Sequence, residues 1–270
     1  MRVAISDDMT ATPVIILTGA GRGIGLATVK YLLALPSPPN ILAVSRVISP
    51  ALRSLAVNNT NLETVAVDFA TPLSELRAEV ESSIINTAIS RWGRIDALLL
   101  NHGVLDPICK VADANVADWE VAWRVNLLSF VEVVRAAIGE LRKVKGRIVL
   151  VSSGASTAAY TGWGAYGASK AAMNHFALTM AREEPDITTV SVRPGIVDTD
   201  MQTALREIHG TVMGPAEHAK FLEFKSSGII VPPENVAVAL GNLCLRAEKD
   251  LSGQFVSWDE ENLASYRREK

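Results

Sequence analysis

Tyr166 and Lys170 are two residues whose types and spacing together suggest chemistry. Residues four apart on a helix lie on the same face, so the Lys170 ammonium can sit beside the Tyr166 phenol. The cation favours the phenolate and lowers the tyrosine pKa from its usual value of about 10. A phenol with a lowered pKa can donate a proton near neutral pH, so the pair predicts a general acid.

This Tyr-Lys spacing is not specific by itself, because Tyr266 and Lys270 repeat it in a charged tail that we expect to be solvated. Ser153 ends an apolar segment thirteen residues before Tyr166, and parallel-sheet enzymes place their sites at such strand ends. Asn126 lies among apolar residues of an expected helix, where an amide without hydrogen bonds is unfavourable. A capping serine and a satisfied core asparagine are the ordinary alternatives, but the combination predicts a catalytic set.

A glycine-rich turn, Thr18–Gly25, separates the first expected strand from the first expected helix. Glycines permit a sharp turn and let backbone N–H groups approach a pyrophosphate, whose charge a helix N-terminus favours. Gly19, Gly23 and Gly25 follow the pattern GxxxGxG rather than GxGxxG, and such a turn can also be purely structural. Its position between strand and helix favours a dinucleotide site.

The end of the second expected strand indicates which dinucleotide is bound. In a site for NAD, an acidic side chain about 20 residues beyond the glycines bonds the ribose 2′-hydroxyl. Ser45 stands at that place and Arg46 follows it. Arg46 can pair with a 2′-phosphate through its planar guanidinium, with help from Arg22, although both arginines could be solvated surface residues. The missing acid predicts NADP(H). The positive nicotinamide of its oxidised form would, together with Lys170, lower the pKa of Tyr166.

Asp68 and Phe69 follow the third expected strand. The Asp68 carboxylate could accept a hydrogen bond from the adenine amino group of the cofactor. The alternative is that it caps the helix expected to begin at Pro72.

Apolar, β-branched segments alternate with longer segments of helical periodicity. The expected strands are Val14–Leu17, Ile41–Val44, Leu62–Val67, Ile95–Leu100, Arg147–Val151 and Thr189–Val192. The expected helices are Gly25–Leu35, Pro72–Trp92, Val116–Arg142 and Ala165–Glu184. This order predicts βαβ units, and nearly continuous apolar strands indicate burial on both faces. We therefore expect an α/β fold, a single doubly wound parallel sheet of about seven strands, Rossmann-like, with helices on both faces.

The length of 270 residues fits a single domain over residues 1–270. Residues 201–233 form the least regular stretch, with several glycines and a Pro-Pro pair, and we expect a mobile substrate lid there. Apolar side chains in and before it could form a substrate wall or simply pack against one another. They are Tyr160, Trp163, Met201, Phe221 and Phe224.

Composition argues against several classes of partner. With a net charge of −3 and no basic block, the sequence predicts no positively charged surface for nucleic acid or an anionic membrane. No apolar run approaches the roughly 20 residues of a membrane span, and Met1–Thr10 lacks the apolar core of a secretion signal. Cys109 and Cys244 show neither metal-ligand spacing nor a disulfide framework. We expect a cytoplasmic protein without a metal.

Together these motifs resemble the short-chain dehydrogenase/reductase family over essentially the whole chain. The matching positions are Thr18–Gly25, Asn101-His-Gly103, Asn126, Ser153, Tyr166 with Lys170, and Arg193-Pro-Gly195. His102 replaces an alanine of the family pattern. The resemblance implies that Tyr166 donates the proton while Ser153 positions the carbonyl oxygen. It also implies that Lys170 lowers the tyrosine pKa and binds the ribose, and that Asn126 holds a water joining Lys170 to solvent.

The resemblance further implies a cofactor site, in which the segment after Pro194 and Gly195 binds the nicotinamide amide. Its residues would be Gly19, Arg22, Gly23, Ile24, Gly25, Arg46, Asp68, Phe69, Asn101, Gly103, Tyr166, Lys170, Pro194, Gly195, Val197 and Thr199. Apolar residues on more than one face of the helices Val116–Arg142 and Ala165–Glu184 suggest contact with a second chain. The resemblance implies a homodimer or homotetramer built on these helices.

Within the family, the segments Trp163–Phe176, Pro194–Met201 and Gly253–Ser257 resemble the benzil reductases, relatives of sepiapterin reductase. This resemblance implies that a small-molecule carbonyl compound, a ketone or vicinal diketone, is reduced to an alcohol or hydroxyketone. Ser257 stands where sepiapterin reductases carry an aspartate that anchors the pterin, although Asp259 is near. Alternatives are a sepiapterin-type reductase, an NAD(P)-dependent alcohol dehydrogenase and an NADP-binding regulator without turnover.

Overall fold

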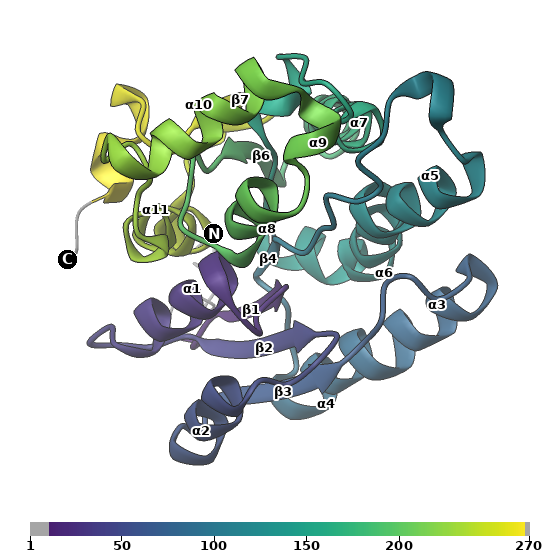
Figure 1. Ribbon diagram of the computed structural model, residues 1–270. Coiled ribbons are helices and arrows are strands. Elements are labelled where there is room, and N and C mark those ends of the chain that lie inside the picture. Colours follow the sequence, from purple (N-terminus) through teal and green to yellow (C-terminus); the bar gives the residue numbers. More distant parts are fainter. Residues whose placement is uncertain (1–10, 268–270) are drawn as a thin grey trace, which may run out of the picture.

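The computed structural model describes residues 11–267, which form one parallel sheet with helices on both faces (Figure 1). The strand order is β3-β2-β1-β4-β5-β6-β7, and every neighbouring pair is parallel. The strands are β1 Val14–Thr18, β2 Asn40–Ser45, β3 Leu62–Ala66, β4 Ala97–Leu100, β5 Arg147–Val151, β6 Thr188–Arg193 and β7 Phe255–Ser257. This topology confirms the predicted doubly wound sheet.

Eleven α-helices lie within the described residues and surround this sheet. They are α1 Gly23–Leu33, α2 Pro50–Asn58, α3 Leu73–Glu79, α4 Asn86–Trp92, α5 Val116–Trp123, α6 Ser129–Val144, α7 Gly164–Glu183, α8 Asp200–Glu207, α9 Gly210–Met213, α10 Pro215–Ser226 and α11 Pro233–Arg246. Alternate residues of β1 show the two layers. Val14 and Ile16 pack in a cluster with α3, α4, α6 and α7, whereas Ile15 and Leu17 pack in a second cluster with α1, α2 and α11.

Two of the expected long helices contain a π-helical turn. Val80–Ile85 joins α3 to α4, and Arg124–Leu128 joins α5 to α6. A π turn inserts an extra residue into the helix and often occurs at a functional site, because it re-aims the side chains that it carries. Asn126 lies in the middle of the second π turn, so the predicted regular helix Val116–Arg142 is corrected at the position that bears a site residue.

The expectation that residues 201–233 are irregular is wrong, because α8, α9 and α10 cover most of this segment (Figure 1). Its glycine and proline residues lie at helix ends. Gly214 has a φ of +78° immediately before Pro215, which is the first residue of α10, and Gly228 has a φ of +74° just beyond the end of α10. Proline at the start and glycine past the end of a helix are the positions that each residue favours.

The C-terminal tail also differs from expectation. Tyr266 is only 4% exposed and belongs to a 3-10 segment, Glu261–Arg267, that packs against α11. Its hydroxyl accepts a hydrogen bond from the Glu248 backbone N at 3.1 Å. Lys270 and Met1–Thr10 lie outside the described residues.

Within residues 11–267, no helix has the length and apolar character needed to cross a bilayer. Cys109 and Cys244 are both free thiols.

Candidate active site

The catalytic residues predicted from the sequence come together at the carboxyl end of β5. Ser153 follows β5, and Tyr166 and Lys170 lie on the first turns of α7. Tyr166 is 7% exposed and hydrogen-bonded to Ser153. Lys170 is 3% exposed, its Nζ lies 5.7 Å from the Tyr166 ring centroid, and it donates a hydrogen bond to the Val151 backbone oxygen at 2.8 Å.

Burial sets the acid–base properties of this pair. It lowers the pKa of Lys170 from 10.5 to about 7, because an ammonium loses hydration in the interior. Burial also raises the pKa of Tyr166, and the hydrogen bond with Ser153 opposes this only in part. The predicted lowering of the tyrosine pKa counted the positive nicotinamide of an oxidised cofactor together with Lys170, so it stays a prediction for the cofactor-bound protein. An adjacent positive charge, such as that of an oxidised nicotinamide, would act in the lowering direction.

Asn126 forms hydrogen bonds with two segments next to this pair, at Val104 and at Ser169. Its Oδ1 accepts a hydrogen bond from the Val104 backbone N, and its Nδ2 donates one to the Val104 backbone oxygen, both at 2.8 Å. Nδ2 also donates to Ser169 Oγ on α7 at 3.3 Å. Gly103 leaves the space between Asn126 and Lys170 open, since a Cβ at position 103 would lie 3.2 Å from Asn126 Oδ1 and 3.7 Å from Lys170 Nζ. One lone pair of Oδ1 is left for the water implied by the resemblance, which stays a prediction.

The glycine turn fits a dinucleotide pyrophosphate. Gly19 has a φ of +69°, and a Cβ on Gly25 would lie 2.1 Å from the Gly19 backbone oxygen, so neither position accepts a side chain. Asn101 Nδ2 donates to the backbone oxygens of Thr18 and Gly19, each at 3.2 Å, and so closes the turn. No side chain caps the N-terminus of α1 at Arg22, so its first backbone N–H groups can meet an anion.

The two arginines predicted for a 2′-phosphate differ in their surroundings. Arg46 is exposed and makes no ion pair with the described residues, whereas Arg22 pairs with Asp200 at 2.5 Å. Ser45 is buried, and its Oγ donates to the Val47 backbone oxygen at 2.8 Å. A Cβ on Gly21 would lie 2.5 Å from that Oγ. A small residue at position 45 therefore lets the glycine turn pack closely against β2.

Asp68 does not cap α3, whose N-cap is Pro72. Its Oδ1 accepts a hydrogen bond from the Ala70 backbone N at 3.0 Å, so the capping alternative is wrong as stated. The role of Asp68 towards adenine stays a prediction. Phe69 is 5% exposed and stacks face to face on His102 with 3.8 Å between ring centroids.

A model of the short chain dehydrogenase family matches residues 13–209. The chain belongs to this family. An uncharacterized oxidoreductase of Schizosaccharomyces pombe is 43% identical over 250 residues, covering 92% of this chain and 97% of that protein. A Saccharomyces cerevisiae benzil reductase, (S)-benzoin forming, is 34% identical over 262 residues, covering 93% and 97%. The crystal structure of a Saccharomyces cerevisiae short chain dehydrogenase/reductase matches with a TM-score of 0.88 and 34% identity, covering 95% of this chain and 100% of that one.

Membership in this family makes the chain an oxidoreductase. Two proteins of the same fold, 22% and 23% identical to this chain, have crystal structures with NAD and with NADP, respectively. The segment after Pro194, which is predicted to bind nicotinamide, makes two contacts that the sequence did not reveal. Gly195 has a φ of +75°, and a Cβ there would lie 3.1 Å from Trp258 Nε1. Asp198 N donates to the Val231 backbone oxygen at 3.0 Å. Trp258 follows β7 without any spacing signal that would have identified it.

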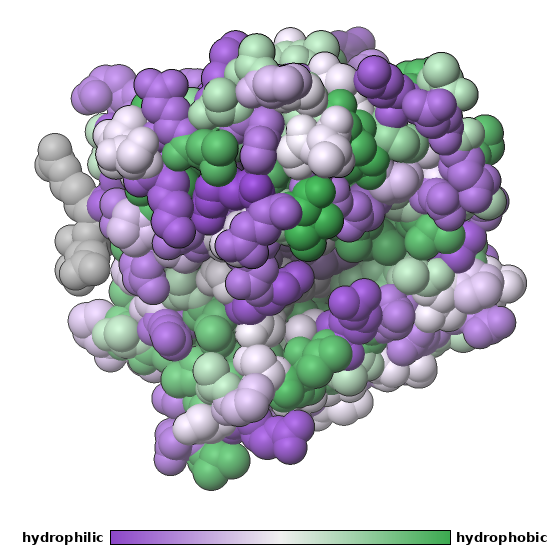
Figure 2. Space-filling view, viewed as in Figure 1, coloured by the Kyte–Doolittle hydropathy of each residue, from purple (hydrophilic) through white to green (hydrophobic). Residues whose placement is uncertain are grey.

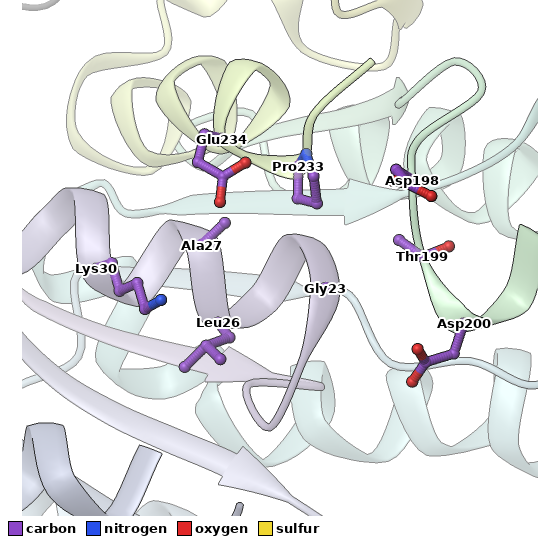
Figure 3. Close-up of a pocket in the computed structure, with 9 residues that line it drawn as sticks. All are labelled: Gly23, Leu26, Ala27, Lys30, Asp198, Thr199, Asp200, Pro233 and Glu234. Carbon is purple, nitrogen blue, oxygen red and sulfur yellow. The ribbon is translucent and has the colours of Figure 1, made fainter. Parts of the chain in front are cut away.

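A cleft connects this segment to the glycine turn (Figure 3). Figure 3 places Gly23, at the start of α1, opposite Thr199 and Asp200. A Cβ on Gly23 would lie 3.2 Å from Thr199 Cγ2, so the two predicted cofactor segments are in contact. Asp198, in the segment predicted to bind the nicotinamide amide, also lines this cleft. The remaining lining residues, which were not predicted from the sequence, are Leu26, Ala27, Lys30, Pro233 and Glu234.

The five apolar residues expected around the substrate form one cluster with Tyr166. Trp163 lies edge-on to Tyr166 with 5.8 Å between ring centroids and packs against Tyr160 at 4.8 Å and Phe221 at 5.7 Å. Phe221 in turn contacts Phe224. Met201 also packs on this cluster, together with Leu105, Ile108, Leu205 and Met213, which sequence reasoning missed. Figure 2 shows that this face of the molecule is hollowed near its centre and has both hydrophilic and hydrophobic residues around the hollow.

Proposed function

We propose that the protein reduces one carbonyl group of a ketone or vicinal diketone with NADPH. The observation that carries the proposal is the buried Tyr166 hydroxyl, bonded to Ser153 and bordered on its other side by an apolar aromatic cluster. A site of this kind offers a proton donor to a substrate that binds mainly by apolar contact. Similarity to a benzil reductase, and Ser257 in place of a pterin-anchoring aspartate, support a diketone.

In the proposed reaction, bound NADPH supplies the hydride for the carbonyl carbon. The hydroxyls of Ser153 and Tyr166 hold the carbonyl oxygen as negative charge grows there, which stabilises the transition state more than the bound ketone. Tyr166 then donates its proton to this oxygen. A protonated Lys170 beside the ring stabilises the resulting phenolate, and its pKa of about 7 lets it release or take up a proton near neutral pH.

Residue types near the glycine turn support NADPH over NADH. Ser45 ends β2 where an acid would bond the 2′-hydroxyl, and no carboxylate replaces it there. The exposed Arg46 and Arg22 are both able to bind a 2′-phosphate. Arg22 would have to exchange its ion pair with Asp200 for that contact.

We propose three further properties, which concern assembly, location and the substrate lid. Exposed apolar side chains occur on α5, α6 and α7, with Val121 41%, Val131 36% and Leu178 56% exposed, and they support a homodimer or homotetramer formed through these helices. The low charge and the free thiols support a cytoplasmic location without nucleic-acid or membrane partners. We also propose that α8–α10 act as the substrate lid.

The function is tested by following NADPH absorbance with a carbonyl panel of benzil, small diketones, sepiapterin and quinones, and by chiral analysis of the products. We expect turnover of benzil with NADPH and formation of one hydroxyketone enantiomer. Tyr166→Phe should lower kcat by about a hundredfold or more while leaving NADPH binding intact. Tyr31→Phe is the matched control, because the Tyr31 hydroxyl has no hydrogen-bond partner among residues 11–267.

Each alternative predicts a different result. Absence of turnover across the whole panel, together with tight NADPH binding, would favour an NADP-binding regulator. Turnover of secondary alcohols with NAD in preference to any reduction would favour an alcohol dehydrogenase. Sepiapterin as the best substrate would contradict the inference drawn from Ser257.

A further inference from the structure

His102 is a buried histidine at a position where the family pattern has alanine, two residues beyond the end of β4. It is 9% exposed, and two aromatic rings pack against it. Its ring stacks on Phe69 with an interplanar angle of 14° and meets Phe130 edge-on at 4.4 Å. These two contacts fix the plane of the ring, and each of its two nitrogens faces a hydroxyl group.

The hydrogen-bond partners of His102 determine its tautomer. Ser129 Oγ donates its single hydrogen to the Val125 backbone oxygen at 2.7 Å, so it must accept a hydrogen bond from His102 Nε2, 2.8 Å away. Nε2 then carries the ring hydrogen, and Nδ1 accepts from Thr18 Oγ1 at 2.7 Å. The other acceptor near the Thr18 hydroxyl, the Leu99 backbone oxygen, is farther away at 3.4 Å.

The surroundings keep this ring neutral. Burial and the nearby charge of Lys170 hold the pKa of His102 well below its ordinary value of 6.5. A protonated ring would also donate from Nδ1, so the Thr18 hydroxyl would have to stop donating to the ring and turn its hydrogen to the more distant Leu99 oxygen. The Nε2–H form therefore persists over the pH range in which an exposed histidine titrates.

The two partners of the ring belong to the two halves of the active site. Thr18 is the last residue of β1 and leads directly into Gly19 of the cofactor turn. Ser129 is the first residue of α6, immediately after the π turn that carries Asn126. Asn126 in turn contacts Ser169, next to Lys170 on α7. His102 is thus the side chain that directly joins the glycine turn to the helix behind the catalytic pair.

We propose that His102 is a positioning residue with two separable functions, one for each ring nitrogen. Nδ1 accepts from Thr18 and keeps the glycine turn in the shape that receives the cofactor. Nε2–H donates to Ser129 and keeps the π turn, and through it Asn126 and Lys170, in place for proton transfer. The effect on turnover rests on the proposed reductase function, whereas the tautomer and the cofactor affinity do not.

Three substitutions separate the two functions. In His102→Ala both hydrogen bonds are lost. The shorter amide of His102→Asn reaches the place of Nδ1 and can keep the Thr18 contact, whereas the longer amide of His102→Gln reaches the place of Nε2 and can keep the Ser129 contact. His175→Ala is the control, since His175 is exposed on α7 and is not part of the site.

The variants are compared by the dissociation constant for NADPH and by kcat with the best carbonyl substrate. We expect His102→Ala to weaken NADPH binding and to lower kcat, each by about tenfold, as for the loss of one buried hydrogen bond. His102→Asn should restore most of the NADPH affinity but not kcat, and His102→Gln should restore most of kcat but not the affinity. Equal losses in all three variants, or no loss in any, would overturn the proposal.

The tautomer is measured on protein that keeps His102, so it does not depend on whether a variant at position 102 folds. The sequence has four histidines. In protein labelled with ¹⁵N-histidine, the His102 ring is the one whose signals persist when His175, His209 and His218 are replaced one at a time. We expect an Nε2–H signal pattern that does not change between about pH 5 and pH 8. An Nδ1–H tautomer, or titration within this range, would refute the proposal even if the protein reduces no carbonyl compound.

Discussion

The acid–base pair illustrates how a single residue depends on its burial. Lys170 loses nearly all contact with solvent, and its one hydrogen bond within the described residues goes to a neutral backbone carbonyl, that of Val151. Its pKa of about 7 means that both charge states are populated at neutral pH. An exposed lysine at the same spacing from a tyrosine would remain charged and could not exchange a proton in this range.

Lys170 should make the free energy of unfolding depend on pH. Its pKa in the folded protein, about 7, lies below its ordinary value of 10.5, so the unfolded chain binds more protons between these two pH values. The free energy of unfolding should therefore rise with pH in this window. Relative to Lys170→Met, we expect the cofactor-free protein to gain about 2 kcal/mol between about pH 7 and pH 9 in urea unfolding. Lys220→Met, at an exposed lysine, is the control, and its free energy of unfolding should change with pH as that of the wild type does. If the difference in free energy of unfolding between wild type and Lys170→Met does not change with pH, the lowered pKa is contradicted.

Arg46 is the residue on which the preference for NADPH can be tested. Arg46→Asp replaces a cation that can pair with the 2′-phosphate by an acid that can bond the 2′-hydroxyl. We expect the ratio of kcat/KM for NADPH to that for NADH to fall by about a hundredfold, the loss of a charge-assisted contact plus like-charge repulsion. Arg53→Asp, on α2, is the control. An unchanged ratio for Arg46→Asp would remove Arg46 from the cofactor site.

At the scale of elements, two helical segments decide the shape of the site. The π turn Arg124–Leu128 aims Asn126 at Val104 and Ser169, which a regular helix with the same residues would aim differently. Helices α8 and α10 carry Leu205 and Phe221 onto Trp163 and Tyr166. The π turn thus contacts α7 at Ser169, whereas α8 and α10 pack in one cluster with Trp163 and Tyr166.

Phe221 is the residue through which α10 should act on the substrate. It is 4% exposed and packs on Trp163, whereas its neighbour Leu222 is 49% exposed. We expect Phe221→Ala to raise KM for benzil by about tenfold or more, since burying an aromatic ring contributes roughly 2 kcal/mol, and to affect a small aliphatic diketone less. Leu222→Ala should leave both KM values unchanged. Equal effects of Phe221→Ala on large and small substrates would indicate a purely structural role for the cluster.

At the scale of the whole molecule, the strand order places the site. The order reverses between β1 and β4, which are neighbours in the sheet although β2 and β3 lie between them in the chain. In an open parallel sheet the connections to the two sides diverge at this point and leave a crevice beyond the carboxyl ends of the strands. The glycine turn follows β1 and Asn101-His102-Gly103 follows β4, so both border that crevice.

The exposed apolar residues of α5–α7 lead to a prediction about assembly. We expect the purified protein to have a mass of two or four chains of 28.9 kDa by light scattering. Leu178→Glu places a charge on the proposed contact face of α7 and should shift the protein towards the monomer, because burying an unpaired carboxylate is unfavourable. Leu222→Glu, at an exposed leucine of α10, should not change the mass. A monomeric wild-type protein would contradict the proposed oligomer.

The sequence by itself determined those features that depend on residues close together in the chain. Alternating apolar and amphipathic segments predicted the parallel sheet, and short motifs such as Thr18–Gly25 and Tyr166 with Lys170 predicted the cofactor turn and the catalytic pair. In each case the required geometry follows from local backbone structure. This is why most strand limits were predicted to within one or two residues.

Other features were decided only by the tertiary structure, because they arise from contacts between distant parts of the chain. The glycines of residues 201–233 could have marked loops or helix ends, and packing on Trp163 selected helices. Burial raises the tyrosine pKa in the protein without cofactor, an effect that local spacing did not reveal, and it encloses Tyr266 in a tail that local charge predicted to be solvated. His102 reaches Thr18, 84 residues away, and Ser129, 27 residues away. No local pattern records such pairs, because they exist only once the sheet and its helices have assembled.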